Sequence, residues 1–242
     1  SGQFRPLMDR LAPHFRVVAA DLYGYGQSPA WPEGERLSLL EEVRLLEPVF
    51  RSCGESFHLV GHSYGAAVAL RAALEFPRRV RSLTLFEPVL FALLFRDASE
   101  RAAAAEIAAV RDDTIAAVAR GDLDGAARRF VDYWMSAGAW DATPEKRRAL
   151  VAPTMRKVKE EWHALIDEPT PLTAFGASNI ETRLLFGTRS PASTRSIIRL
   201  LSSSIPEVEL VEMDGLGHMG PVTHPDLVNA EIERLLAHVS GT

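Results

Sequence analysis

The chain has 242 residues, 47% of them hydrophobic, which is enough to bury the core of one large domain or of a domain with an insertion. A formal net charge of −5 without a Lys/Arg run argues against a nucleic-acid partner, and no apolar run is long enough to cross a membrane. The single cysteine, Cys53, excludes an intrachain disulfide and implies no oxidising compartment, so we expect an inert thiol and a cytoplasmic protein.

Short apolar runs rich in Val and Leu alternate along the chain with longer stretches of helical periodicity. This alternation is typical of a parallel sheet covered by helices, whose strands are buried on both faces. We therefore predict an α/β fold with a mostly parallel, doubly wound sheet. The predicted strands are Arg16–Asp21, Phe57–Gly61, Val80–Glu87, Thr182–Gly187 and Glu207–Met213.

The predicted helices fall into two groups. In the first group, Ser38 and Glu41 form a capping box that begins one helix, and Tyr64–Phe76 is a second helix stopped by Pro77. The second group lies between residues 91 and 175, where no convincing strand is found. Its helices are expected at Ala98–Ala119, at Leu123–Met135, from Thr143 onwards and at Thr154–Ile166. We interpret 91–175 as a helical insertion into a core formed by 1–90 and 176–242.

Residues 61–65 read GHSYG, a G-x-S-x-G nucleophile elbow between a predicted strand and a predicted helix. A sharp strand-to-helix turn exposes the serine hydroxyl, and we expect crowding at the positions two before and two after it, which favours glycine at both. Free N–H groups at the start of the helix can stabilise an oxyanion. We predict Ser63 as the nucleophile and the N–H of Tyr64 as an oxyanion donor.

A serine nucleophile needs a base to take its proton, and histidine often has that role. Of seven histidines, His218 lies in the segment MDGLGHMGP directly after the last predicted strand, where catalytic groups of open α/β sheets gather. His62 lies inside the elbow, and His224 is expected to cap or orient the last helix. The other four have ordinary surface or core interpretations, so we predict His218 as the base.

Four segments together resemble the α/β-hydrolase superfamily in its small form with a helical cap. They are VAADLYGYGQS (18–28), FHLVGHSYGAA (57–67), LTLFEP (83–88) and GLGHMGPVTHP (215–225). They span nearly the whole chain, and residues 91–175, the cap in this comparison, are covered least. The resemblance implies a triad in the chain order serine, acid, histidine. It also makes Asp21 a turn-forming residue before Gly24 and Gly26.

The acid of the triad departs from the commonest pattern of the superfamily. Many relatives carry it after the strand that follows the cap, where this chain has Ser190, which cannot carry a negative charge. Some members carry it one strand earlier, where this chain has Glu87 at the end of an apolar strand. Asp214 is a rival but lies only four residues before His218. We therefore predict Glu87 as the acid and expect Ser190 to matter little.

The resemblance also implies structure that these 242 residues lack. Such enzymes begin with a hairpin and a central strand ending in a His-Gly loop, which supplies the second oxyanion N–H. Ser1–Leu11 already resembles the first helix after that loop. We expect the first strands and the second donor to lie upstream in a longer protein or in another polypeptide, because unpaired strand edges promote aggregation.

These residues predict a serine hydrolase that acts on an ester-like bond of a small hydrophobic substrate through an acyl-enzyme, without metal or organic cofactor. Two alternatives stay open: a carbon–carbon bond hydrolase, and a small-molecule receptor with little turnover, because fold alone does not set function. The predicted cap is rich in aromatic residues, most of them core. Trp134 and Trp140 are our candidates for lining an acyl pocket.

Overall fold

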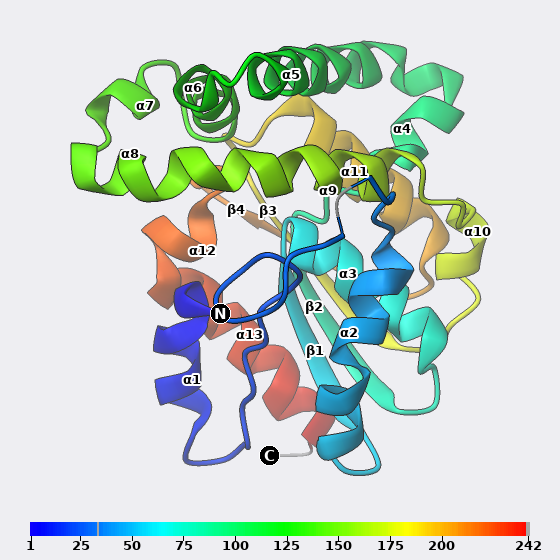
Figure 1. The fold of residues 1–242 in the computed structure, drawn as a ribbon. Coiled ribbons are helices and arrows are strands. Elements are labelled where there is room, and N and C mark those ends of the chain that lie inside the picture. Colours follow the sequence, from blue (N-terminus) through cyan, green and yellow to red (C-terminus); the bar gives the residue numbers. More distant parts are fainter. Residues whose placement is uncertain (33, 241–242) are drawn as a thin grey trace.

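A four-stranded parallel sheet lies at the centre of the computed structural model, which describes residues 1–32 and 34–240 (Figure 1). The strands lie side by side in chain order, and each pairs in parallel with the next. Parallel neighbours need crossover connections, and helical segments supply them here. The strands are β1 (Phe57–His62), β2 (Val80–Phe86), β3 (Glu181–Gly187) and β4 (Glu209–Met213). This arrangement confirms the predicted α/β fold.

Both faces of the sheet are covered, because successive strand residues point to opposite sides. Leu85 packs into a large cluster on the side of α2, α3 and α11, whereas the next residue, Phe86, packs into a second cluster with residues of α1 and α13. The helices around the sheet are α1 (Arg5–Leu11), α2 (Leu39–Ser52), α3 (Tyr64–Glu75), α11 (Ala192–Ser204), α12 (Gly220–Thr223) and α13 (Pro225–Ser240).

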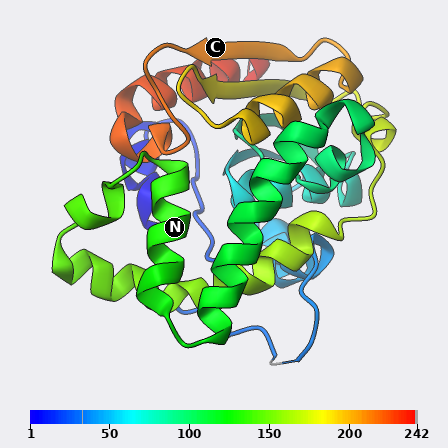
Figure 2. The same cartoon turned by 90° about the horizontal axis from the view of Figure 1, so that it is seen from above.

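The chain between β2 and β3 forms helices and no strand, as predicted. Figure 1 shows α5, α6, α8 and α9 above the end where the strands finish, with α10 at the side of the core, and Figure 2 shows α5 and α6 from above. The helices are α4 (Ala92–Arg96), α5 (Arg101–Ala119), α6 (Leu123–Trp134), α7 (Ala139–Ala142), α8 (Glu145–Val151), α9 (Met155–Ile166) and α10 (Leu172–Phe175). Of these, the short helices α4, α7 and α10 were not predicted.

The predicted strand at Arg16–Asp21 was wrong. This segment makes no strand ladder in the described residues, where β1 pairs only with β2. A cavity lined by both Arg16–Asp21 and Phe57–His62 separates the segment from the free edge of β1. Apolar composition is therefore not sufficient for a strand, because the backbone also needs a hydrogen-bonding neighbour.

Local signals explain several element boundaries. The Ser38 side chain accepts a hydrogen bond from the Glu41 N–H at 3.2 Å, so the capping residue predicted for α2 is in place. The last strand begins at Glu209 rather than Glu207, because Glu207 has a φ of 51°, outside the β region. Gly54, with a φ of 78°, follows the end of α2.

Candidate active site

Ser63 occupies the sharp turn between β1 and α3. Its φ of 54° and ψ of −121° are rare for a residue with a side chain, which is typical of backbone strain at a functional position. A Cβ atom at Gly61 would lie 2.5 Å from the Ala66 Cα, so only glycine fits there. At Gly65 a Cβ would meet no atom within 4 Å other than its chain neighbours and its own helix, so the crowding predicted two residues after the serine is not seen among the described residues.

His218 lies in the loop between β4 and α12, and its Nε2 is 2.9 Å from Ser63 Oγ. The loop is held from below by His62, whose Nε2–H donates to the His218 carbonyl at 2.8 Å. Burial, with a smaller effect of the neighbouring His218, lowers the pKa of His62 to about 3. His62 is therefore neutral at physiological pH, with its proton on Nε2, and serves as a hydrogen-bond donor to the loop.

Glu87 directly follows β2, with a φ of 46°, and is fully buried. Its Oε2 is 2.7 Å from His218 Nδ1. Its Oε1 accepts hydrogen bonds from the Gly187 N–H at 2.8 Å and from the Ser190 hydroxyl. Burial opposes ionisation, but the hydrogen bond and charge of His218, together with the bonds from Ser190 and Gly187, outweigh it and lower the pKa of Glu87 below 4.5.

The remaining acidic candidates lie elsewhere. Asp214 Oδ1 accepts a hydrogen bond from Thr188 Oγ1 at 3.3 Å and has no bond to His218. Asp21 binds the α-amino group of Ser1 at 2.6 Å, and its carboxylate fills the space where a Cβ at Gly26 would lie. Asp21 thus packs under its own turn. The structure brings Ser63, His218 and Glu87 together and leaves both aspartates outside the group.

Tyr64 is the first residue of α3, so helix geometry leaves its N–H without an intrahelical partner. Because Tyr64 directly follows Ser63, its N–H lies beside the serine. It is our candidate donor to the oxyanion that would form when Ser63 attacks a carbonyl group. The Tyr64 hydroxyl donates to Glu42 Oε1 at 3.0 Å, which fixes the other end of the residue. This contact between Tyr64 and Glu42 could not be predicted, because the two residues lie in separate helices.

Trp134, at the end of α6, covers the catalytic histidine candidate. The centroids of the Trp134 and His218 rings lie 4.1 Å apart with the planes tilted by 32°. Trp140 is fully buried, and its indole Nε1–H donates to Asp124 Oδ1 at 3.1 Å. Both tryptophans lie in the wall of the cavity that contains Ser63, but only Trp134 contacts the candidate triad.

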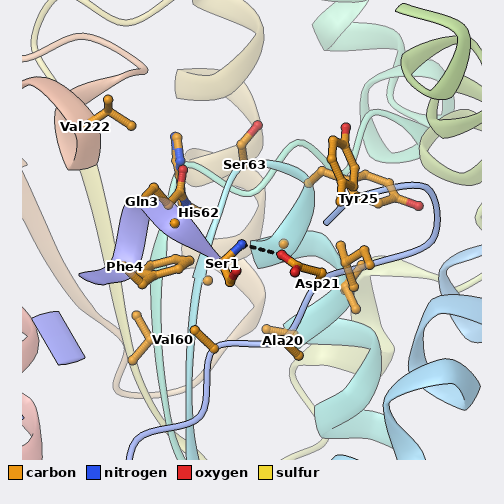
Figure 3. A pocket seen from close by; sticks show the side chains of 18 of the residues that line it. Ser1, Gln3, Phe4, Ala20, Asp21, Tyr25, Val60, His62, Ser63 and Val222 are labelled. Atoms are coloured by element: carbon orange, nitrogen blue, oxygen red, sulfur yellow. Dashed lines mark hydrogen bonds and ion pairs between the residues drawn. The ribbon is translucent and has the colours of Figure 1, made fainter. Parts of the chain in front are cut away.

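That cavity has a volume of about 1530 Å³ and is mainly apolar. Figure 3 shows some of the side chains that line it, among them Ser63, Tyr25, Phe4 and Val60. It extends from Ser63 along the free edge of β1 to the segment Arg16–Asp21. Its size exceeds the roughly 300–1,000 Å³ of a small-molecule pocket, because it combines the space beneath the helices with the slot beside β1.

A buried polar cluster beside this cavity connects α9 to α2, to α3 and to the loop that contains Tyr25. Lys157 Nζ lies 2.7 Å from Glu42 Oε1 of α2 and 3.8 Å from Glu161 Oε1, one turn along α9. The Tyr25 hydroxyl donates to Glu161 Oε1 at 2.8 Å, and the Lys157 ammonium lies 5.3 Å from the Tyr64 ring centroid. Sequence reasoning missed this cluster, because its members come from four separate segments.

Among residues 1–32 and 34–240, no group of three or more His, Cys, Asp or Glu side chains is arranged to hold a metal ion. Likewise, none of the helices in these residues has the length and apolar character needed to cross a membrane.

The chain belongs to the alpha/beta hydrolase family, which it matches over residues 1–231. Among curated relatives, the probable lysophospholipase BODYGUARD 2 of Arabidopsis thaliana is 34% identical over 87 residues, or 35% of this chain and 18% of that protein. Such matches span 17 to 34% of the relatives' lengths.

Solved structures resemble the whole chain. A thermophilic esterase from Thermogutta terrifontis has a TM-score of 0.76 at 20% identity, covering 98% of this chain and 85% of that one. The 2-hydroxy-6-oxo-6-phenylhexa-2,4-dienoate hydrolase of a Rhodococcus species has a TM-score of 0.71 at 22% identity, covering 100% and 85%. At these identities the likeness establishes the fold alone.

Proposed function

We propose that the protein is a serine hydrolase that cleaves an ester-like bond of a small, mainly apolar substrate through Ser63, His218 and Glu87. The observation that carries the proposal is the continuous relay from Glu87 Oε2 to His218 Nδ1 at 2.7 Å and from His218 Nε2 to Ser63 Oγ at 2.9 Å. Nucleophile, base and orienting acid are thus each in hydrogen-bond contact with the next.

The reaction follows from these contacts. His218 Nε2 takes the proton of Ser63 as Oγ attacks the substrate carbonyl, and the Tyr64 N–H stabilises the resulting oxyanion. The protonated imidazole then gives that proton to the leaving alcohol. The alcohol departs, and the acyl group remains bound to Ser63 as an acyl-enzyme. Water, deprotonated by His218, then attacks the acyl group, and the imidazolium returns the proton to Ser63 Oγ as the acyl–oxygen bond breaks and the acid leaves. Glu87 keeps the Nδ1–H tautomer and balances the imidazolium charge throughout.

The aromatic residues that the cap contributes to the cavity wall support an apolar substrate. We place the catalytic core in 1–90 and 176–242, of which 33 and 241–242 lie outside the described residues, and the cap in 91–175. The cap contributes Trp134, which lies over His218, and other apolar groups of the cavity wall, including Trp140. An aromatic wall of this kind favours uncharged, hydrophobic acyl groups over charged ones.

Substitution of Ser63 tests the proposal. Ser63→Ala should lower turnover of an activated p-nitrophenyl ester by about 10³-fold or more, because covalent catalysis is lost while the fold is kept. A fluorophosphonate should label the native protein and fail to label Ser63→Ala. The exposed Ser203 provides a matched control, since Ser203→Ala removes a hydroxyl on α11 that contacts only Leu200 O. Labelling that survives Ser63→Ala, or native protein without turnover, would refute the assignment.

A further inference from the structure

Glu161 is a buried acid whose carboxylate is only half satisfied by the protein. Its Oε1 accepts a hydrogen bond from the Tyr25 hydroxyl at 2.8 Å and lies 3.8 Å from Lys157 Nζ. Its Oε2 has no donor among the described residues.

The nearest positive charge does not balance Glu161. Lys157 is closer to Glu42, at 2.7 Å, and Glu42 also accepts bonds from the Tyr64 hydroxyl and the Tyr23 N–H. One ammonium therefore faces two carboxyl groups. A buried carboxyl without a full set of partners is costly, and such a group is commonly completed by a ligand.

Glu161 is one of the residues that border the cavity described above. Glu161 lines the same cavity as Ser63 and Trp134, next to the apolar side chains of Met155 and Val158 from its own helix. We propose that Glu161 is a specificity-determining residue, whose Oε2 binds a hydrogen-bond donor, a hydroxyl or an ammonium group, on an otherwise apolar substrate. The inference rests on the proposed ester hydrolysis and adds one polar feature to its substrate.

The surroundings of Glu161 are consistent with such a role. Burial raises the pKa of Glu161 to about 7, against the opposing effects of Lys157 and the Tyr25 hydroxyl, and Glu42 adds to the rise. The charged and titratable groups that face it are thus Lys157 from α9, Glu42 from α2 and Tyr25 from the loop after Asp21. A bound ammonium would favour the ionised carboxylate, whereas a hydroxyl can bond to either form.

Paired substrates test the subsite. A series of p-nitrophenyl esters of increasing acyl length is prepared with three chain ends: hydroxyl, ammonium, and methoxy, which cannot donate. The wild-type kcat/KM should be about tenfold or more higher for a donor-bearing ester than for the methoxy ester of the same length, at the length that reaches Glu161. The hydroxyl and ammonium arms identify which donor is preferred.

Three variants assign the preference to Glu161. Glu161→Leu should reduce the donor-to-methoxy ratio to about one, and Glu161→Gln should remove any ammonium preference while keeping part of a hydroxyl preference. Glu160→Leu, at the preceding residue of α9, whose side chain lies outside the cavity wall, should keep the wild-type ratio. Because the readout is a ratio within one protein, altered overall activity does not affect it. If Glu161→Leu does not fold, the wild-type and Glu161→Gln ratios decide the question.

Two failures can be told apart. Ser63 labelled by a fluorophosphonate and methoxy esters hydrolysed, with a ratio near one at every length in the wild type, would overturn the subsite and leave the serine hydrolase intact. A preference that persists in Glu161→Leu would also overturn it. Absence of both labelling and hydrolysis would refute the proposed function, and the subsite with it.

Discussion

Ser190 stands at the position where the resemblance to this family leads one to expect the catalytic acid, and its hydroxyl donates a hydrogen bond to Glu87, the acid that we propose. Together with the Gly187 N–H it satisfies Glu87 Oε1, which leaves Oε2 free to bond to His218. Ser190→Ala removes one of two donors from a fully buried carboxylate. The sequence alone led us to expect that Ser190 matters little. Because of this contact, we now expect Ser190→Ala to lower both stability and turnover.

The size of that effect follows from the contact. A hydrogen bond to a charged group contributes roughly 1.5–3 kcal/mol, so Ser190→Ala should lower the free energy of unfolding by about that amount at pH 7. Catalysis should fall by about tenfold, equivalent to about 1.4 kcal/mol, because Glu87 is then aimed less firmly at His218. Urea unfolding and kcat/KM with an activated ester measure the two quantities, with Ser203→Ala as control.

The pH dependence gives a sharper check. Because its native-state pKa lies below 4.5, ionised Glu87 contributes stability above that pH, which is lost as the pH falls through the lowered native value. Ser190→Ala raises this pKa, so the stability difference between variant and wild type should shrink below about pH 4.5. A variant with wild-type turnover and stability, or a stability loss that is constant from pH 7 to pH 4, would contradict this account.

The other predictions concern neighbouring groups. Glu87→Gln should lower turnover by about 10²–10⁴-fold, since an amide can leave the wrong histidine tautomer in place; adding Ser190→Asp should restore part of the rate, and failure to do so would show that the two strand ends do not serve one imidazole. Trp134→Leu should lower kcat by about 3- to 30-fold, because an aromatic ring beside a cationic imidazole stabilises it by roughly 0.5–2 kcal/mol, and Trp134→Phe should lose less; equal losses would contradict a role for the ring. The pKa of His62 is about 3 in the native protein and 6.5 for a histidine in the unfolded chain. The unfolded state therefore binds one more proton than the native state as the pH falls from about 6.5 towards 3. Stability should fall by up to about 1.4 kcal/mol per pH unit in that window, and urea unfolding at several pH values should show a smaller slope for His62→Gln, whereas an unchanged slope would rule out His62 as the source.

Much of the fold and of the candidate site could be predicted because the signals are local. The elbow at 61–65 lies between an apolar run and a helical run, so chain position alone indicated Ser63. His218 followed from its place after the last strand. Glu87 followed from an exception: the commoner acid position holds Ser190, and the predicted strand before it along the core, Val80–Glu87, ends in a carboxylate.

The features that could not be predicted depend on contacts between distant segments. The hydrogen bond of Ser190 to Glu87 joins the ends of two neighbouring strands. The sequence shows a serine at the commoner position of the acid, but it does not show that this serine donates a hydrogen bond to Glu87. In the sequence, Lys157 and Glu161 are charged residues of a predicted helix, and only the packing of that helix against α2 shows that they are buried. Arg16–Asp21 had the composition of a strand but not a partner.

Ser63 and Glu87 follow directly after His62 and Phe86, which are paired in the register of β1 and β2, and both have a positive φ. Each such position costs roughly 1–3 kcal/mol in a residue with a side chain. At position 63 glycine would relieve that cost and would also remove the proposed nucleophile, whereas at position 87 it would leave the Gly187 N–H and the Ser190 hydroxyl without their buried acceptor. Thermal stability and the proposed catalysis therefore favour different residues at position 63. A library of variants screened only for thermal stability should accumulate glycine at position 63, unless every round also selects for turnover.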